Sequence, residues 1–423
     1  MTETSDAVIR FVDQRDGMRK CVNVLLCVTA VVGIGLSATV LWRNLNARHQ
    51  INEACAGLVP AGRVLALSPA GGTISHRLAD EGTIELDGGL PQDCEIFSTE
   101  AGQKHHTSSG ERWFFTATVG VLPTGAEDQW MPEDPLDHLA DPYSDDPTYP
   151  AEPMGGGISG AVTATSVTVR LSCTDGTSGG DPIKELWARA ALMDPGPAFL
   201  EKGQLTSHDR NILAETAVGT ANNLAERLDC TNRLADPPEN VPALEEGPVP
   251  AGSADGTCAW YHKADFASDR QLPDQVLESR TDDKAWDERC GLTLSGTRAN
   301  ALWESDASKI DSFERPSQPA EWYVSLHTYA GEPAKNVYLK SDYENVPTAA
   351  VPGQAGRSDR PIWWASSVCD GKPQIHTMTV SYPYNRLTIP ALEKVFRAYV
   401  TDVVARRGCT DTELPAASTF YAD

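Results

Sequence analysis

The sequence predicts an α+β protein: an N-terminal transmembrane helix followed by two similar disulfide-linked domains, each an antiparallel sheet packed against amphipathic helices. Three observations predict this fold class. An uncharged apolar run lies near the N-terminus, eight cysteines beyond it divide into two sets of four, and strand and helix patterns recur around those cysteines in the same order.

Residues 21–42 form the expected membrane span, because this run carries no charged side chain. At 1.5 Å per residue a helix of this length reaches about 33 Å, enough to cross a hydrocarbon layer of about 30 Å. A cleaved signal peptide would have a shorter apolar core, of about 7–15 residues. We therefore expect an uncleaved anchor, and cleavage after Ser37-Ala38 is the alternative.

Two observations predict which side of the membrane each part occupies. Basic residues tend to stay on the cytoplasmic side of a span, and four of them precede this one while two follow it closely. Disulfides need an oxidising compartment, so the cysteine-rich body should lie outside. Residues 1–20 are thus predicted to be a cytoplasmic tail, and the body is predicted to lie on the outer side of the cell membrane. The flanking basic residues are Arg10, Arg15, Arg19 and Lys20 before the span, and Arg43 and Arg48 after it.

The charge of the chain excludes one class of partner. It has 59 acidic and 35 basic residues, a net charge of −24, and the first twenty residues hold four of each sign. The whole excess therefore belongs to the part beyond the membrane span. A field of that sign repels phosphate backbones, so we expect no nucleic-acid partner.

Eight cysteines in the body are expected to form disulfides, because none has the CxxC or Cys/His spacing of a zinc site. Four cysteines allow three pairings, and spacing alone does not choose among them. We favour pairing of neighbours within each set, because a bond between the third and fourth cysteines would join a helix to a sheet across the core. The two sets are Cys55, Cys94, Cys173 and Cys230, then Cys258, Cys290, Cys369 and Cys409.

The patterns around the two sets predict an internal repeat. An aromatic strand follows the second cysteine in each set, at Trp113–Thr118 and Trp322–His327, and the third cysteine ends a strand before a turn (LSC-TDG; SVC-DG). A Leu-Thr pair then opens a one-faced amphipathic helix that ends at the fourth cysteine. The expected units are residues 51–235 and 257–423, joined by a linker rich in Pro, Gly and Glu at residues 236–256.

Two stretches of the first unit need separate interpretation. Residues 123–157 contain nine acidic residues, seven prolines and no Lys or Arg, which is typical of a disordered or loosely held surface loop. Ile183–Met193 has helix-forming composition. Its counterpart in the second unit, Gln374–Tyr382, alternates like a strand, so we predict a strand at Ile183–Met193 as well.

No motif predicts catalysis, a cofactor or a metal site. Ser178 lies in a G-x-S-x-G string, but a strand is expected to follow it, which makes the string a hairpin rather than a nucleophile elbow. The acidic loop lacks EF-hand spacing. His105 and His106 lack the i, i+4 spacing that would put both on one helix face. Trp363-Trp364 is expected to pack in the core, with a contact site as the alternative.

The cysteine-bounded segments LSC-TDG…ERLDC and SVC-DG…RRGC carry a resemblance to a known type of domain. Each unit resembles the small disulfide-paired α+β domains of actinobacterial surface lipoproteins and of kinase sensor regions, here in tandem. The resemblance covers about two-thirds of the body and brings no binding motif with it. It implies an extracytoplasmic role without catalysis.

The sequence therefore predicts a single-pass membrane protein that is not an enzyme and whose body binds a protein or small ligand or scaffolds a complex. Its one defined partner is the lipid bilayer, through residues 21–42. A cell-envelope hydrolase with a site invisible in the sequence is the alternative. Thr29, Gly33 and Ser37 form a small-residue stripe that would let two helices approach, although nothing else supports a homo-oligomer. Cys21 and Cys27 are expected to be free thiols.

Overall fold

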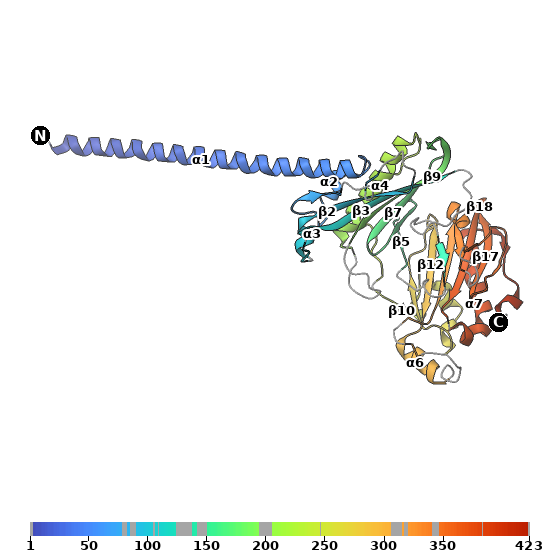
Figure 1. Cartoon of the computed structure of the whole chain (residues 1–423). Helices are drawn as coiled ribbons and strands as arrows, with labels where there is room; N and C mark the ends of the chain where they lie inside the picture. Colours follow the sequence, from blue (N-terminus) through green and yellow to red (C-terminus); the bar gives the residue numbers. More distant parts are fainter. Residues whose placement is uncertain are drawn as a thin grey trace.

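The computed structural model has a mixed α+β fold with antiparallel sheets, an N-terminal apolar helix and four disulfides. Figure 1 shows two β-rich units beside each other, with the long helix extending from the first. The residues described are 3–77, 83–84, 90–104, 106–108, 110–123, 138–141, 150–193, 205–245, 247–305, 315–316, 320–340, 347–382 and 384–421.

The first element is a single helix, α1 (Glu3–Ala54), which projects from the body in Figure 1. Its segment Leu25–Ala54 reaches a mean hydropathy of 2.2 and is long and apolar enough to cross a membrane. Large apolar side chains such as Ile34 and Trp42 are about 70% and 71% exposed. The helix does not end at residue 42, because Ala47 and Ile51 are already buried in the core of the first unit.

The first sheet is antiparallel, and α4 (Ser207–Arg227) packs on its inner face. Thr206 caps this helix by accepting a hydrogen bond from the Asp209 amide, 3.1 Å away. Two further short helices, α2 (Ala61–Val64) and α3 (Thr99–Lys104), lie in this unit. The strand order is β1 (Ile74–Ser75), β2 (Gln92–Ser98), β3 (Arg112–Pro123), β9 (Asp181–Leu192), β7 (Ser166–Ser172), β6 (Gly160–Val162) and β5 (Glu152–Pro153), with β8 (Thr177–Ser178) paired to β9.

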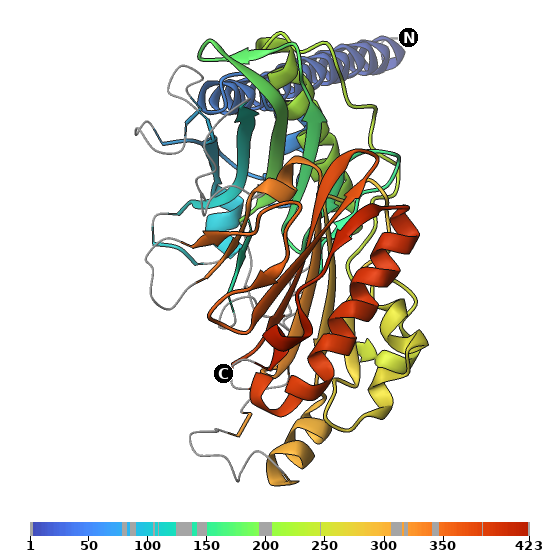
Figure 2. The same ribbon diagram turned by 90° about the vertical axis from the view of Figure 1, so that its right-hand side faces the viewer.

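The second sheet is also antiparallel and is covered by α7 (Asn385–Arg407), which runs along it in Figure 2. The strand order is β10 (Val249–Pro250), β11 (Gln275–Glu278), β12 (Asp287–Thr293), β13 (Tyr323–Ala330), β18 (Lys372–Val380), β17 (Ile362–Cys369) and β16 (Gly356–Arg357), with β19 (Thr410–Glu413) paired to β17. The shorter helices are α5 (Ala259–Lys263), α6 (Gly296–Ser305), η2 (Ala251–Ser253), η3 (Phe266–Ser268), η5 (Glu332–Lys335) and η6 (Ala417–Phe420).

A third, small sheet joins the two units. Strand β4 (His138–Ala140), which precedes β5 of the first unit, pairs in parallel with β14 (Val337–Leu339) of the second, and β14 pairs with β15 (Thr348–Ala349). Ala140 is fully buried there. Residues 138–141 and 150–157 are therefore structured, unlike the loosely held loop expected across 123–157, because strand pairing and burial in a distant part of the chain hold them. The remainder of that tract, residues 124–137 and 142–149, lies outside the described residues.

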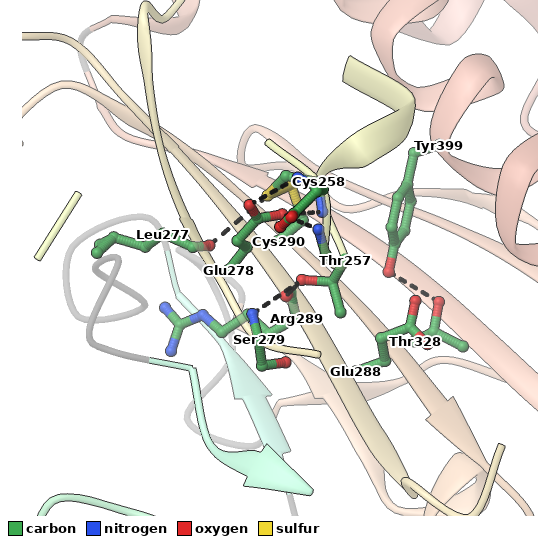
Figure 3. Close-up of a disulfide and its surroundings, with 12 residues drawn as sticks. Thr257, Cys258, Leu277, Glu278, Ser279, Glu288, Arg289, Cys290, Thr328 and Tyr399 are labelled. Carbon is green, nitrogen blue, oxygen red and sulfur yellow. Dashed lines mark hydrogen bonds between the residues drawn. A yellow bond between two sulfur atoms is a disulfide. The ribbon is translucent and has the colours of Figure 1, made fainter. Parts of the chain in front are cut away.

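The four disulfides join neighbouring cysteines, as expected from the sequence: Cys55–Cys94, Cys173–Cys230, Cys258–Cys290 and Cys369–Cys409. Figure 3 shows the third of these, with Glu278 beneath it. The Glu278 carboxylate accepts hydrogen bonds from the amides of Asp255, Gly256 and Cys258, at 2.9 to 3.0 Å. These bonds fix the segment that leads into α5, and burial still raises the pKa of Glu278.

Strand β9 and residues 236–256 are two segments for which the sequence made a specific prediction. Ile183–Leu192 is a strand, as predicted, and its helix-forming composition is overridden because β9 lies between β3 and β7. Residues 236–256, expected to be a linker, contain packed side chains: Val241 and Leu244 are buried in the first core, and Ala251 and Ala254 in the second.

Candidate functional site

The outer face of the first sheet packs against the second unit around two tryptophans. Trp187 on β9 is fully buried and lies over Gly120 of β3, where an added Cβ would come within 2.3 Å of the indole. Glycine is required at residue 120 for this close approach. Trp187 contacts Trp286 of the second unit, and the Arg170 guanidinium lies 5.4 Å from the ring centre of Trp286. This contact is a cation–π interaction across the junction.

Ion pairs and hydrogen bonds extend the junction on both sides of the tryptophans. Arg280 pairs with Glu152 at 3.1 Å, Lys184 with Glu332 at 3.3 Å, and Lys340 with Asp141 at 2.7 Å. The Ser159 hydroxyl donates to the Lys284 carbonyl at 3.1 Å. In each of these contacts one partner belongs to the first unit and the other to the second, so the units are held by polar contacts as well as by packing.

A cleft of about 380 Å³ opens at this junction, which we call the junction pocket. Its first-unit wall comes from Ser159, just before β6, and from β7 and β9. Its second-unit wall comes from the segment before β12, the end of β13, the β17–β18 turn and the end of α7. The charged lining residues are five basic (Arg170, Lys284, Lys372, Arg406, Arg407) and three acidic (Glu185, Asp283, Asp370). Interfaces between domains are a common location for small-ligand sites.

The inner charges of the junction pocket are paired with each other. Arg170 bonds to Glu185, and Arg406 and Arg407 both bond to Glu288, whose side chain is 1% exposed. At the mouth lie the exposed side chains of Asp283, Lys284, Asp370 and Lys372. Among the described residues these four make no side-chain ion pair, so a ligand can reach uncommitted charges of both signs.

A hydrogen-bonded chain of Ser, His and Asp lies on the outer face of the second sheet. The His327 ring bonds to the Asp287 carboxylate at 3.0 Å through Nδ1 and to the Ser325 hydroxyl at 3.3 Å through Nε2. Tyr329 also reaches His327 Nδ1, at 2.7 Å. Burial alone would raise the pKa of Asp287, but His327 with its hydrogen bond, together with His138 and Arg289, brings that pKa below its ordinary value.

This chain has the connectivity of a catalytic triad but not its accessibility. Ser325 is fully buried, and β13 pairs it with Gly291 on one side and Thr379 on the other. A catalytic serine must reach its substrate and needs free backbone donors beside it for an oxyanion. Ser325 meets neither requirement, so the arrangement is suited to holding strands together.

A second polar network lies between the second sheet and α7. His376 bonds to Thr328 at 2.8 Å and to Ser367 at 2.9 Å, and Thr328 bonds to Tyr399 at 2.8 Å, a pair visible in Figure 3. Burial and then the charge of Arg407 lower the pKa of His376 to about 3. The imidazole is therefore neutral at pH 7 and accepts a hydrogen bond inside the core.

The structure separates the residues that the sequence offered as candidates. Ser178 is in β8, which pairs with Asp181 of β9, so the G-x-S-x-G string is a hairpin as expected. His106 is exposed on a turn, and His105 lies outside the described residues. Trp363 is buried in the second core, whereas Trp364 packs on the opposite face of β17. None of these side chains lines the junction pocket.

Sequence reasoning missed the junction pocket because its lining comes from seven separate segments of the chain. The turn Asp370–Lys372 could be predicted only as the turn after the third cysteine of the second set. Among the described residues, no group of three or more His, Cys, Asp and Glu side chains is placed to hold a metal ion. Cys27 is a free thiol on the exposed surface of α1, as expected.

Comparison with known proteins adds no assignment. No family model matches the chain, and neither a curated protein nor a solved structure matches it.

Proposed function

We propose that this chain is a single-pass membrane protein whose extracytoplasmic body binds or scaffolds a partner without catalysis. The observation that carries the proposal is α1: its described apolar side chains between Leu25 and Trp42 are exposed, and the same helix continues into a disulfide-closed core. Exposed apolar surface of this extent is unfavourable in water and favourable in lipid. Residues 21–42 cross the bilayer, and residues 1–20 remain in the cytoplasm.

The outward orientation of the body rests on the disulfides and on the flanking charges. Four disulfides persist in an oxidising compartment and not in the cytosol. Basic residues before the span outnumber those after it. Both arguments give the same side of the membrane.

The body consists of two copies of one disulfide-closed α+β unit. Three features support this duplication: strand order β2-β3-β9-β7-β6 parallels β12-β13-β18-β17-β16, one long helix covers each sheet, and corresponding cysteines are bonded. The unit is of the kind that the sequence resembles in bacterial surface lipoproteins and sensor regions. The junction pocket between the copies is where a small partner would bind.

Extraction from membranes tests the anchor. Full-length protein should stay in the membrane fraction after alkaline carbonate treatment, and its mature N-terminus should lie before residue 21. A variant with Ile34→Asp and Val32→Asp should be released, because charges at mid-span are costly in lipid. Release of the unaltered chain by carbonate, or a mature N-terminus beyond Ala38, would contradict the proposal.

A cell-envelope hydrolase is the alternative, and the Ser325–His327–Asp287 chain is the place to test it, because its connectivity is that of a triad although Ser325 is buried. Substitution Ser325→Ala decides between the two. The binding role predicts no reaction with a serine-directed fluorophosphonate probe in either protein. Labelling of the unaltered chain that is lost in Ser325→Ala, with the fold retained, would establish the hydrolase instead.

A further inference from the structure

We propose that the junction pocket binds a zwitterion, a short peptide with free amino and carboxyl ends, held between the two units. This inference deepens the proposed binding role and rests on it. It follows from the charges that line the pocket, from the size of the pocket and from the electric field of the whole body.

The mouth of the pocket offers charges of both signs in matched pairs. The segment before β12 supplies Asp283 and Lys284, and the β17–β18 turn supplies Asp370 and Lys372; all four side chains are exposed. Among the described residues, none of these four side chains forms an ion pair. A ligand with one ammonium and one carboxylate group can satisfy both signs, whereas an anion or a cation satisfies only one.

The inner wall of the pocket is already neutral and fixed. Arg170 is paired with Glu185 and lies against Trp286. Arg406 and Arg407 share Glu288, and Arg406 also pairs with Asp402 at 3.2 Å, so three guanidinium groups meet three carboxylates. These guanidinium groups are committed to carboxylates, so they do not make the pocket an anion site. Their pairing holds the wall in place before a ligand arrives, which lowers the entropic cost of binding.

The volume of the pocket and the net charge of the body further restrict the kind of ligand that can bind. The cleft volume of about 380 Å³ lies at the lower end of the range of small-ligand pockets, about 300–1,000 Å³, and so fits a ligand as small as a dipeptide. The net charge of −24 repels anions from the body. A zwitterion carries no net charge and enters without that penalty.

Four dipeptide probes separate the charge requirements. We would titrate full-length protein in detergent micelles and follow the fluorescence of Trp286 and the other tryptophans. The probes are Ala-Ala, its N-acetyl form (anion only), its C-terminal amide (cation only) and the form blocked at both ends. Ala-Ala should bind, and each of the other three should bind at least about tenfold more weakly, because each leaves a charged group of the pocket without its partner.

Two variants test the residues. Lys372→Ala and Asp283→Ala should each weaken Ala-Ala binding about tenfold or more, and both should fold because the side chains are exposed. Lys394→Ala, on the exposed side of α7 and away from the pocket lining, is the matched control and should bind like the unaltered chain.

Equal binding of the N-acetyl form would make the pocket an anion site, and equal binding of the amide would make it a cation site; either result overturns the proposal. So does failure of all four probes to bind, or binding that Lys372→Ala leaves unchanged. None of these outcomes alters the carbonate extraction of the membrane anchor, so failure of the ligand class is distinguishable from failure of the anchored role.

Discussion

The Glu288 carboxylate sits under the end of α7, where Arg406 and Arg407 both donate to it, and its side chain is only 1% exposed. Burial alone would lower the pKa of Arg406, but Glu288 and then Asp402 raise it above its ordinary value. A buried ion pair adds little net stability, because the cost of desolvating its charges offsets their attraction. Removal of one partner is nevertheless strongly destabilising, because it leaves the other charge buried and unpaired. The packing of α7 on the second sheet is therefore expected to be sensitive to substitution of any one member of this cluster.

Substitution Glu288→Ala should destabilise the second unit by about 3–5 kcal/mol, because it leaves two arginines without their shared carboxylate. Urea unfolding followed by tryptophan fluorescence measures the loss. Glu413→Ala, at an exposed carboxylate on β19, is the control and should change the free energy of unfolding by less than about 0.5 kcal/mol. Equal effects of the two substitutions would show that the Glu288 cluster does not hold α7.

His376 gives the second unit a defined dependence on pH. Its pKa of about 3 in the folded chain lies below the value of about 6.5 for an unfolded imidazole. The neutral form is thus favoured on folding, so the stabilisation is complete above pH 6.5 and is lost as the pH falls toward 3. Between pH 6.5 and 4 the loss amounts to about 3 kcal/mol, at about 1.4 kcal/mol per pH unit.

Substitution His376→Gln removes this titrating group while keeping a hydrogen-bonding side chain. The free energy of unfolding of the variant should fall by about 3 kcal/mol less than that of the unaltered chain between pH 6.5 and 4. His262→Gln, at an exposed histidine, should keep the original pH dependence. If His376→Gln and the unaltered chain lose stability in parallel, His376 does not titrate as the structure implies.

Single-residue chemistry could be predicted from the sequence only where partners are close along the chain. The hairpin at Ser178 could be predicted because the strand after it was inferred from its counterpart in the second unit, Gln374–Tyr382. By contrast, the hydrogen bond between Asp287 and His327 joins residues 40 positions apart, and the bond between Glu288 and Arg406 joins residues 118 positions apart. Such contacts depend on strand register, which a single sequence does not reveal.

At the level of elements, the cysteines and the alternating strands carried most of the predictive information. Helix α4 begins directly after Thr206, as the Leu-Thr signal indicated, but α7 begins at Asn385, before its Leu-Thr pair. Amino-acid composition did not predict strand β4. Its acidic, proline-rich surroundings resemble disorder, whereas its strand pairing comes from β14, about 200 residues later.

The Cys369–Cys409 bond should stabilise the second unit by about 4 kcal/mol, because it closes a loop with a separation of 40 residues. The double variant Cys369→Ala/Cys409→Ala should therefore become sensitive to protease across residues 257–423 while residues 55–230 stay protected. Cys173→Ala/Cys230→Ala is the reciprocal control and should expose the first unit. Simultaneous loss of protection in both units, from either variant, would contradict separate folding of the two.

On the scale of the whole molecule, α1 joins the apolar segment that we propose as the membrane anchor to the body as one continuous helix. The helix leaves its apolar stretch at Trp42 and is buried in the first core from Ala47, about 7–8 Å further along its axis at 1.5 Å per residue. With the helix in a bilayer, the first unit lies at the membrane surface.

The orientation of the body is the most direct test of this account. Alkaline phosphatase, which needs disulfides to be active, and a fluorescent protein that matures only in the cytosol should each be fused after Asp423 of the full-length chain. We predict active phosphatase and a dark fluorescent fusion, with protein levels matched by immunoblot. A bright fluorescent fusion with inactive phosphatase would place the cysteine-rich body in the cytoplasm and contradict the account.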